Sequence, residues 1–264
     1  ILPGGALNAS GSSCSDNITL LSQSAGSQAF INTSGTNLAN GIRSMYSALR
    51  NIRLELDEKI GQDVNRINDI LRSIAGLNNQ IIALNANGIQ NSAFTNQRAQ
   101  LVKELSGMMD IQSFEDAEGG LTIMTPGGNT LLDKETVFPL TAVRSASDNS
   151  YRITWSGNGT SSVDVTDSIL GGSLKALLDL RDRYLPDFMG SIDALAQSLM
   201  SEVNGIHAAG YTANGTTGVN FFRAASDNYT LSFNLSDEVK ADVRNIAVTS
   251  SPSNQSNNDI ALAL

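Results

Sequence analysis

The 264-residue sequence is poor in the residues that build reactive centres. It contains one cysteine, Cys14, and one histidine, His207. A single cysteine forms no internal disulfide, and a single histidine leaves no second imidazole for a histidine-based metal cluster. No G-x-S-x-G, P-loop or G-x-G-x-x-G motif occurs. We therefore predict no enzyme: no catalytic residue, no cofactor and no cofactor-binding residue, and no metal ligand. Cys14 is interpreted as an incidental free thiol.

Positive charge and long apolar runs are also scarce. The chain has 17 Lys and Arg against 26 Asp and Glu, a net charge of −9, and the basic residues do not cluster. Repulsion of phosphate therefore excludes nucleic acid as a partner. A membrane-spanning helix needs about 20 consecutive apolar residues, and the sequence has no such run. The first residues, 1–5, are neither a signal peptide nor an initiator.

The strongest positive feature is a heptad pattern between residues 38 and 84. Apolar residues recur at alternating steps of three and four, which places them on one stripe of a long helix. They are Leu38, Ile42, Met45, Leu49, Ile52, Leu56, Ile60, Val64, Ile67, Leu71, Ile74, Leu77, Ile81 and Leu84. At 1.5 Å per residue this helix would be about 70 Å long, too long for a compact domain of this size. The pattern therefore favours a rod-like assembly component that needs partner helices.

Further helix is expected on both sides of this run. Residues 1–17 are rich in Gly, Ser and Asn and should be loose, whereas residues 18–31 predict a short helix that ends at residues 32–35. Ser92 can cap a second helix, so residues 36–110 are predicted to form an antiparallel helical pair. The buried side of this second helix carries Phe94, Leu101, Val102, Leu105 and Met108.

The hydrophobic period changes to two after Ile111. Leu121 and Ile123 alternate with polar residues, as Ile153 and Trp155 do, and turn signals occur at residues 118–120, 126–128 and 157–159. We predict an inserted antiparallel β domain over residues 111–168, with Trp155 in its core rather than at a ligand site.

Several acidic residues in this region suggest calcium binding or a glycosidase carboxylate pair. The D-x-[DN]-x-[DN]-G spacing of a calcium loop is missing, and acid-rich loops are common in β domains. We therefore interpret these residues as solvated loop and edge residues. They are Glu115, Asp116, Glu118, Asp164 and Asp167.

Helical periodicity returns over residues 169–210. Pro186 lies inside this segment and predicts a kink or a break, and Gly210 ends it. His207 is interpreted as a structural residue that contacts the last helix carbonyls or packs near the following crossover. The apolar series is Leu174, Leu178, Leu185, Phe188, Ile192, Leu195, Leu199, Val203 and Ile206.

Residues 211–250 are predicted to form a β hairpin or a small mixed segment. Strict alternation of apolar residues at 229–235 predicts a strand, and residues 239–248 fit either a strand or a helix. Residues 251–264 are interpreted as a linker and the start of a truncated helix, capped by Asn258 or Asp259. The predicted fold class is α+β: an elongated, coiled-coil-like helical bundle domain, whose first part is residues 1–110, with an inserted small antiparallel β domain.

Three segments resemble one protein family. The first includes LNNQI at 77–81 and NQRAQLVKEL at 96–105. The second includes GGSLKALLDLRD at 171–182, NGIHAAGY at 204–211, Asn214-Gly215 and Phe221-Phe222, and the third is residues 257–264. In this order they resemble the first hook-associated proteins of the bacterial flagellum, the hook–filament junction family. The chain departs from that pattern at Ala99, where the family has Asp, and at Thr212 or Ala213, where the family has the Asp of a Gly-x-Asp-x-Asn-Gly loop.

The resemblance implies a structural protein without catalytic residues. Members of this family are extracellular, are exported through the flagellar type III apparatus without a cleaved signal, and form a ring of identical copies. The implied partners are those copies, the hook protein, the second junction protein and an export chaperone. The family's terminal helices are not found in this sequence, so we expect a fragment that is monomeric.

Two other classes of function stay open. One is a different flagellar axial protein, such as the second junction subunit or a flagellin-like protein, or a surface adhesin or other binding module. The other is a cell-wall hydrolase, which is disfavoured because no paired acid and base stands out in the sequence.

Overall fold

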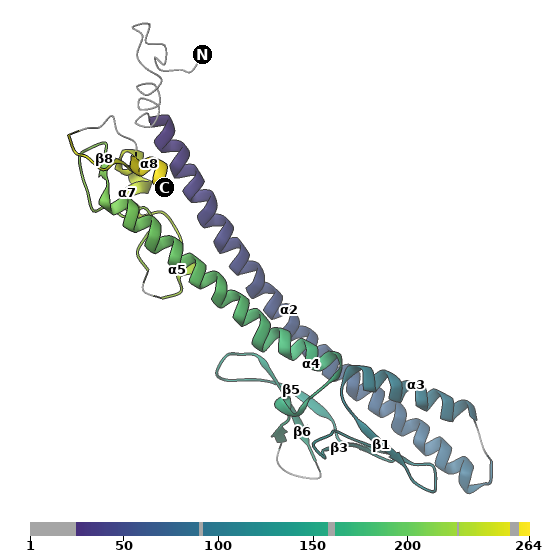
Figure 1. Cartoon of the computed structure of the whole chain (residues 1–264). Coiled ribbons are helices and arrows are strands. Elements are labelled where there is room, and N and C mark those ends of the chain that lie inside the picture. The colour runs from purple at the N-terminus through teal and green to yellow at the C-terminus, as the bar shows by residue number, and fades with distance from the viewer. Residues whose placement is uncertain (1–24, 90–91, 158–161, 226, 254–258) are drawn as a thin grey trace. The chain divides into compact units, whose positions relative to one another are not determined.

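The computed structural model describes residues 25–89, 92–157, 162–225, 227–253 and 259–264 (Figure 1). The chain divides into two compact units. Unit 1 consists of Ile1–Arg50 and Asp187–Leu264, and unit 2 consists of Asn51–Pro186. Each unit has its own hydrophobic core. Long helices combined with short antiparallel sheets confirm the predicted α+β fold class.

The heptad run lies in one helix, α2 (Ala25–Ala86), whose 62 residues contribute to both units. The predicted break at residues 32–35 is wrong, because α2 continues through them. A Cβ atom at Gly35 would lie 2.7 Å from the ring of Phe221. The glycine that suggested a helix end therefore lets an aromatic ring approach the helix backbone. Residues 18–24 of the predicted short helix lie outside the described residues.

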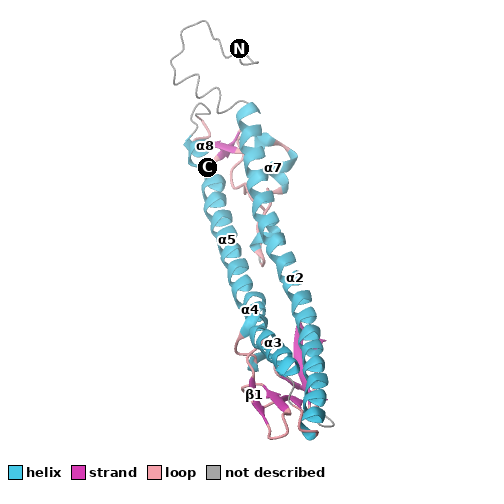
Figure 2. Cartoon of the chain, turned by 90° about the vertical axis from the view of Figure 1, so that its right-hand side faces the viewer, coloured by secondary structure: helices cyan, strands magenta, loops and turns pink. Residues whose placement is uncertain are grey.

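Unit 2 combines the later part of α2 with a second helix and two antiparallel sheets. Helix α3 (Ser92–Met108) runs antiparallel to α2 (Figures 1 and 2). The sheet orders are β1-β2-β3-β4 and β5-β6-β7. The strands are β1 (Gln112–Glu115), β2 (Leu121–Met124), β3 (Thr130–Asp133), β4 (Thr136–Val137), β5 (Leu140–Arg144), β6 (Tyr151–Ser156) and β7 (Ser162–Asp164). The helical pair and the change of period after residue 111 are confirmed.

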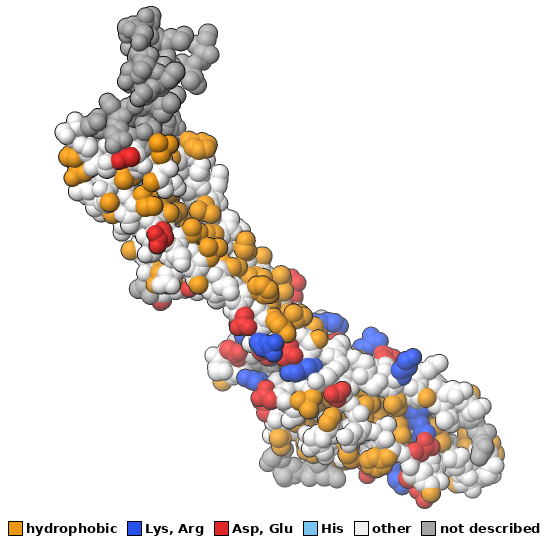
Figure 3. All heavy atoms as spheres, in the orientation of Figure 1, with side chains coloured by type: hydrophobic (Ala, Val, Ile, Leu, Met, Phe, Trp, Pro, Cys, Tyr) orange, Lys and Arg blue, Asp and Glu red, His pale blue; other side chains and the backbone are white. Residues whose placement is uncertain are grey.

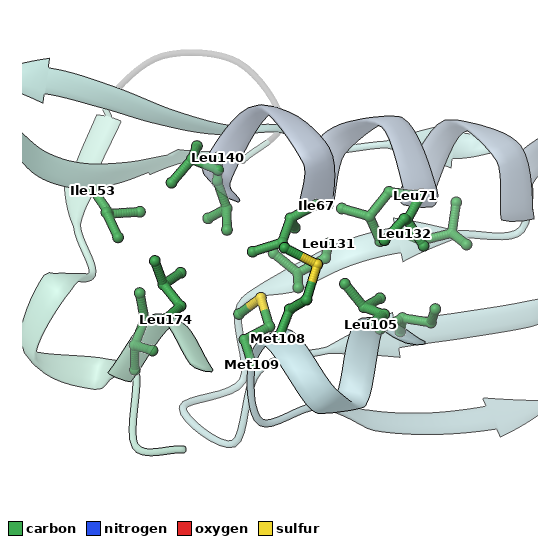
Figure 4. Packing of buried hydrophobic residues seen from close by; sticks show 14 of the residues in the cluster. Ile67, Leu71, Leu105, Met108, Met109, Leu131, Leu132, Leu140, Ile153 and Leu174 are labelled. Atoms are coloured by element: carbon green, nitrogen blue, oxygen red, sulfur yellow. The ribbon is translucent and has the colours of Figure 1, made fainter. Parts of the chain in front are cut away.

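The core of unit 2 lies where the stripe of α2 meets α3 and the sheets. Figure 4 shows side chains from these elements pointing toward one another, among them Ile67, Leu105 and Leu132. Burial of each such side chain contributes about 1.5–3 kcal/mol. Trp155 packs against this core, and its Nε1 donates to the Thr130 carbonyl at 2.8 Å. Trp155 is thus a partly buried residue at the edge of this core, with its polar atom satisfied.

The return helix begins in unit 2 and contains a π-helical turn. A 3₁₀ turn, η1 (Thr166–Ser168), precedes α4 (Gly172–Asp179), and η2 (Leu180–Tyr184) is the π turn that leads into α5 (Leu185–Ala209). The helix is not broken at Pro186. Proline has no N–H and crowds the carbonyl four residues earlier, and a wider π turn directly before it accommodates both effects.

Glycine is required at the start of α4. Gly172 has φ +78°, and a Cβ atom there would overlap the backbone of Met108 at the end of α3. The left-handed conformation and the close approach both exclude a larger residue. Gly172 therefore fixes how α4 begins against α3.

Unit 1 combines the first part of α2 with α5, which lie side by side and antiparallel (Figures 1 and 2). Short elements follow Gly210: β8 (Tyr211–Thr212), α6 (Tyr229–Ser232), α7 (Asp237–Ala241), the 3₁₀ turn η3 (Val243–Asn245), β9 (Ala247–Thr249) and α8 (Asp259–Ala263). Strand β8 pairs with β9. The core contains Ala39, Ile42, Ala196, Met200, Phe221, Phe222, Phe233, Leu235, Val239 and Ile246.

The strand predicted at residues 229–235 is wrong. Tyr229–Ser232 is the short helix α6, because Asn228 adopts φ +41° and its Oδ1 accepts a hydrogen bond from the N–H of Leu231 at 3.0 Å. A capping asparagine therefore outweighs the alternation of apolar residues. The sequence of residues 239–248 fits either a strand or a helix. In the structure this segment begins in helix α7 and ends in strand β9.

Candidate functional site

Two residues of the first sequence motif form a buried polar cluster in unit 2. Asn78 on α2 is fully buried and donates from Nδ2 to the carbonyls of Leu121 (2.9 Å) and Lys134 (2.6 Å). Its Oδ1 accepts a hydrogen bond from Arg98 Nη1 at 2.8 Å. Arg98 also donates to a carbonyl of the β1–β2 turn and pairs with Glu115 at 2.8 Å. The cluster thus holds the first sheet against α2 and α3.

A second buried cluster surrounds Asp57 on α2. Its Oδ1 accepts hydrogen bonds from Arg181 Nη1 (2.6 Å) and from the N–H of Tyr151 (2.8 Å), and Arg144 pairs with its other oxygen. Arg181, in the π turn, also donates to the Tyr151 carbonyl at 2.8 Å. Burial disfavours the charge of Arg181, but its bonds to Asp182 and Asp57 outweigh burial and raise its pKa.

Two asparagines make what we call paired amide contacts, in which one side-chain amide bonds both the N–H and the C=O of a single residue. Asn68 makes this contact with Leu140, at 3.0 and 2.7 Å. Asn204 makes it with Phe222, at 2.7 and 2.9 Å. The geometry reproduces the two bonds that a neighbouring antiparallel strand would supply. A helix thereby satisfies the backbone of a segment that packs on it.

The one histidine is fully buried in unit 1. His207 Nδ1 lies 2.7 Å from the Val219 carbonyl, and its Nε2 accepts a hydrogen bond from the N–H of Ala247 at 2.9 Å. Burial lowers its pKa below the ordinary value, although the bond to Val219 acts in the opposite direction. Both ring nitrogens are therefore engaged in structural bonds. His207 packs near the crossover, as expected, and bonds to the segments after α5 rather than to the last helix carbonyls.

The departures from the family pattern leave the local structure intact. Thr212 Oγ1 accepts hydrogen bonds from the N–H groups of Asn214 (3.3 Å) and Thr216 (3.1 Å). A threonine hydroxyl thus forms the same type of turn that an aspartate carboxylate forms. Ala99 is exposed on α3, beside the buried Arg98.

Four of the acidic residues considered as metal ligands are engaged by other groups of the protein. Glu115 pairs with an arginine of α3, and Asp164 accepts a bond from a backbone N–H. Asp116 and Glu118 both pair with Lys134, and the hydrogen bond from Lys134 is the main reason why the pKa of Asp116 falls to about 2. Among the described residues, no group of three or more His, Cys, Asp or Glu side chains could hold a metal ion. Cys14 lies outside the described residues.

Asp57, Asn68 and Arg144 make structural contacts that sequence reasoning missed. Asp57 and Asn68 each directly follow an apolar stripe residue of α2. In unit 2 the buried positions of α2 include residues next to the stripe, because α3 and the sheets both pack on this helix. The sequence signal that could have identified Asp57 and Asn68 is a polar residue directly beside the apolar stripe.

Unit 1 leaves a large part of its helix surface apolar and exposed. On α2, Leu38 is 43% and Met45 55% exposed, and on α5, Phe188 is 62% and Leu195 54% exposed. We call these four residues the apolar face of unit 1. Figure 3 shows apolar side chains gathered over α2 and α5. Exposed apolar surface of this kind is typical of an interaction site. No helix of the described residues is long and apolar enough to span a membrane.

Comparison with known proteins supports the resemblance. The profile of the family described as "Flagellar hook-associated protein FlgK helical domain" matches residues 13–222. Flagellar hook-associated protein 1 of Escherichia coli is 31% identical over 189 residues, which is 70% of this chain and 35% of that protein. The protein of the same name from Bacillus subtilis is 23% identical over 211 residues, 71% of this chain and 42% of that protein.

A solved structure shows the same fold. The flagellar hook junction protein FlgK from Burkholderia pseudomallei has a TM-score of 0.68 and 23% identity, and the match covers 80% of this chain and 39% of that one. The match to the E. coli relative spans about a third of that protein's length. The family profile covers well over half of the chain, and the chain therefore belongs to the flagellar hook-associated protein FlgK family.

Proposed function

We propose that the protein containing this chain is a structural subunit of the bacterial flagellum, located outside the cell at the junction between hook and filament. The names of the relatives support this location. The proposed role involves no catalysis. The motif residues support this, since Asn78, Arg98, Arg181, Asn204 and His207 all make contacts that hold the fold together.

The observation that carries the proposal is the apolar face of unit 1. The later part of the same heptad stripe is covered within unit 2, whereas Leu38 and Met45 are exposed. Burial of apolar surface gains about 25 cal/mol per Å², so a helix packed along this face would be held firmly. We propose that other subunits cover it: copies of the same protein in a ring, the hook protein and the second junction protein.

Export and domain organisation complete the proposal. The protein passes unfolded through the flagellar type III apparatus, with an export chaperone beforehand. Residues 1–110 and 169–210 belong to the helical shaft, residues 111–168 form the inserted β domain, and residues 211–250 form a small mixed segment. The chain by itself is monomeric, and a stable ring in analytical ultracentrifugation would contradict this.

Charge substitutions on the apolar face test the assembly role. The full-length protein with Met45→Lys and Leu195→Lys is expressed in a strain that lacks its own copy. Both side chains are exposed, so we expect an unchanged circular dichroism spectrum but loss of filament assembly and swimming. The control is Val163→Lys, which places one lysine on an apolar residue of β7 that is 48% exposed and should keep motility, as each single substitution on the apolar face should not. Normal swimming of the double variant would refute the proposal.

The alternatives predict different results. An adhesin or other binding module should show a rise in melting temperature when its ligand is added, and a junction subunit should not. A flagellin-like protein would be found along the filament instead of at its base when labelled with antibody.

A further inference from the structure

His207 connects three segments of unit 1 that are distant in the sequence. It lies near the end of α5, and its ring bonds Val219 through Nδ1 and Ala247, in β9, through Nε2. The ring is fully buried and packs beside Phe221, with 5.4 Å between the ring centroids. Three residues close to these contacts in sequence, Phe221, Phe222 and Ile246, belong to the hydrophobic core of unit 1.

The two bonds define the protonation state of the ring. The backbone N–H of Ala247 can only donate, so Nε2 must be the unprotonated nitrogen, and Nδ1 carries the hydrogen that it donates to the Val219 carbonyl. Protonation of Nε2 would place an N–H against the N–H of Ala247. The bond to β9 would be lost, and a charge would be left in a site from which water is excluded.

The charged residues on the neighbouring elements do not compensate for this charge. Arg223 pairs with Asp237, and Arg244, which precedes β9, pairs with Asp242. On α5 itself Glu202 is exposed, and Asp259 at the start of α8 accepts two bonds from Ser250. The lowered pKa of His207 is caused mainly by burial and not by a nearby charge.

We propose that His207 is an acid-sensitive latch in unit 1: as the pH falls below about 6.5, its protonation releases the 211–250 segment from α5 while unit 2 stays folded. The folded state holds the neutral ring, so the released state binds the additional proton more readily. Stability from this group is complete above the ordinary histidine pKa of about 6.5 and falls as the pH decreases below it. The released fraction should rise by up to about tenfold for each pH unit between 6.5 and the lowered pKa of the folded state.

Two carboxylates of unit 1 titrate below the ordinary aspartate range. The carboxylates of Asp237 and Asp242 have pKa values held below the ordinary value, mainly by hydrogen bonds from Arg223 and Arg244. They lose their charge at lower pH than His207 gains its own. The inference rests on the geometry of unit 1 and does not depend on the proposed flagellar function.

Amide hydrogen exchange followed by mass spectrometry tests the latch in the whole chain. Exchange is measured at pH 7, 6 and 5 and corrected for the intrinsic pH dependence of amide exchange. Protection of peptides covering residues 211–222 and 243–249 should fall severalfold from pH 7 to pH 5, whereas peptides covering residues 121–133 of unit 2 should keep theirs. Equal protection at pH 7 and pH 5 in the unit 1 peptides would overturn the proposal, as would an equal fall in both units.

A variant and a direct titration complete the test. His207→Gln keeps a side chain that can both donate and accept but cannot titrate, so its protection should not change between pH 7 and pH 5. A fall in this variant equal to that of the unchanged protein would overturn the proposal. Because the chain has one histidine, its ring protons give a single set of NMR signals. A midpoint below about 6.5 supports the latch, and a midpoint at or above it refutes the proposal, whether or not the variant folds.

Discussion

Replacing Arg181 by methionine removes one partner of a buried ion pair while it keeps a long, flexible side chain in place. Arg181 is 1% exposed, and the side chain of its partner, Asp57, is 6% exposed. Removing one partner of a buried pair costs about 3–5 kcal/mol, because the other charge is left uncompensated. Asp57 keeps Arg144 and the N–H of Tyr151, so we expect a loss near 3 kcal/mol, the lower end of that range.

Urea unfolding followed by fluorescence measures this loss. Trp155 is the only tryptophan and packs on the core of unit 2, so its signal reports the unit that contains Arg181. With a slope of about 2 kcal/mol per M, the midpoint should fall by about 1.5 M. The control is Arg66→Met, which removes an ion pair with Glu104 in which the arginine side chain is 65% exposed, and which should cost less than about 1 kcal/mol. A midpoint for Arg181→Met as high as that of the control would refute the reasoning.

Three further predictions concern single contacts. Gly35→Ala should lower the melting temperature, because its Cβ atom would overlap Phe221 at a cost of about 1–3 kcal/mol. Gly41→Ala, in the same helix with open space around it, should raise stability by about 0.5–1 kcal/mol, and equal effects at both positions would contradict the role of Gly35. Asn204→Leu leaves two backbone groups without their amide partner and should cost about 2 kcal/mol in calorimetry, and a neutral result would show that water replaces the amide. Asp116 should titrate near pH 2 by NMR. Its contribution to stability is then complete above about pH 4 and is lost as the pH falls toward 2. A midpoint near 4 would contradict the bond from Lys134.

Periodicity predicted the parts of the fold that depend on local pattern. The apolar stripe of α2, the helix beginning at Ser92 and the change to strands after residue 111 follow directly from spacings of 3.5 and 2. Periodicity predicted the wrong structure where a single residue sets the backbone conformation. Gly35 was interpreted as part of a helix end, whereas it makes room for the ring of Phe221 beside the helix. Asn228 caps a short helix within a sequence whose apolar residues alternate as in a strand.

The polar contacts were predictable only in part. Asn78, Arg98, Arg181, Asn204 and His207 all belong to segments that the sequence singled out, but their partners come from residues 12 to 124 positions away. A sequence pattern gives no information on which backbone group a buried amide will meet. The roles of these residues therefore required the three-dimensional structure.

Chemical labelling of the apolar face in assembled flagella tests the proposed role most directly. Met45→Cys is introduced into the full-length protein together with Cys14→Ser, and a maleimide reagent is applied to the free protein and to intact flagella. Because Met45 is 55% exposed, the free protein should label readily, and assembly should reduce the labelling rate at least tenfold. Equal labelling of the free and assembled protein would show that this face stays open to solvent and would contradict its role in assembly.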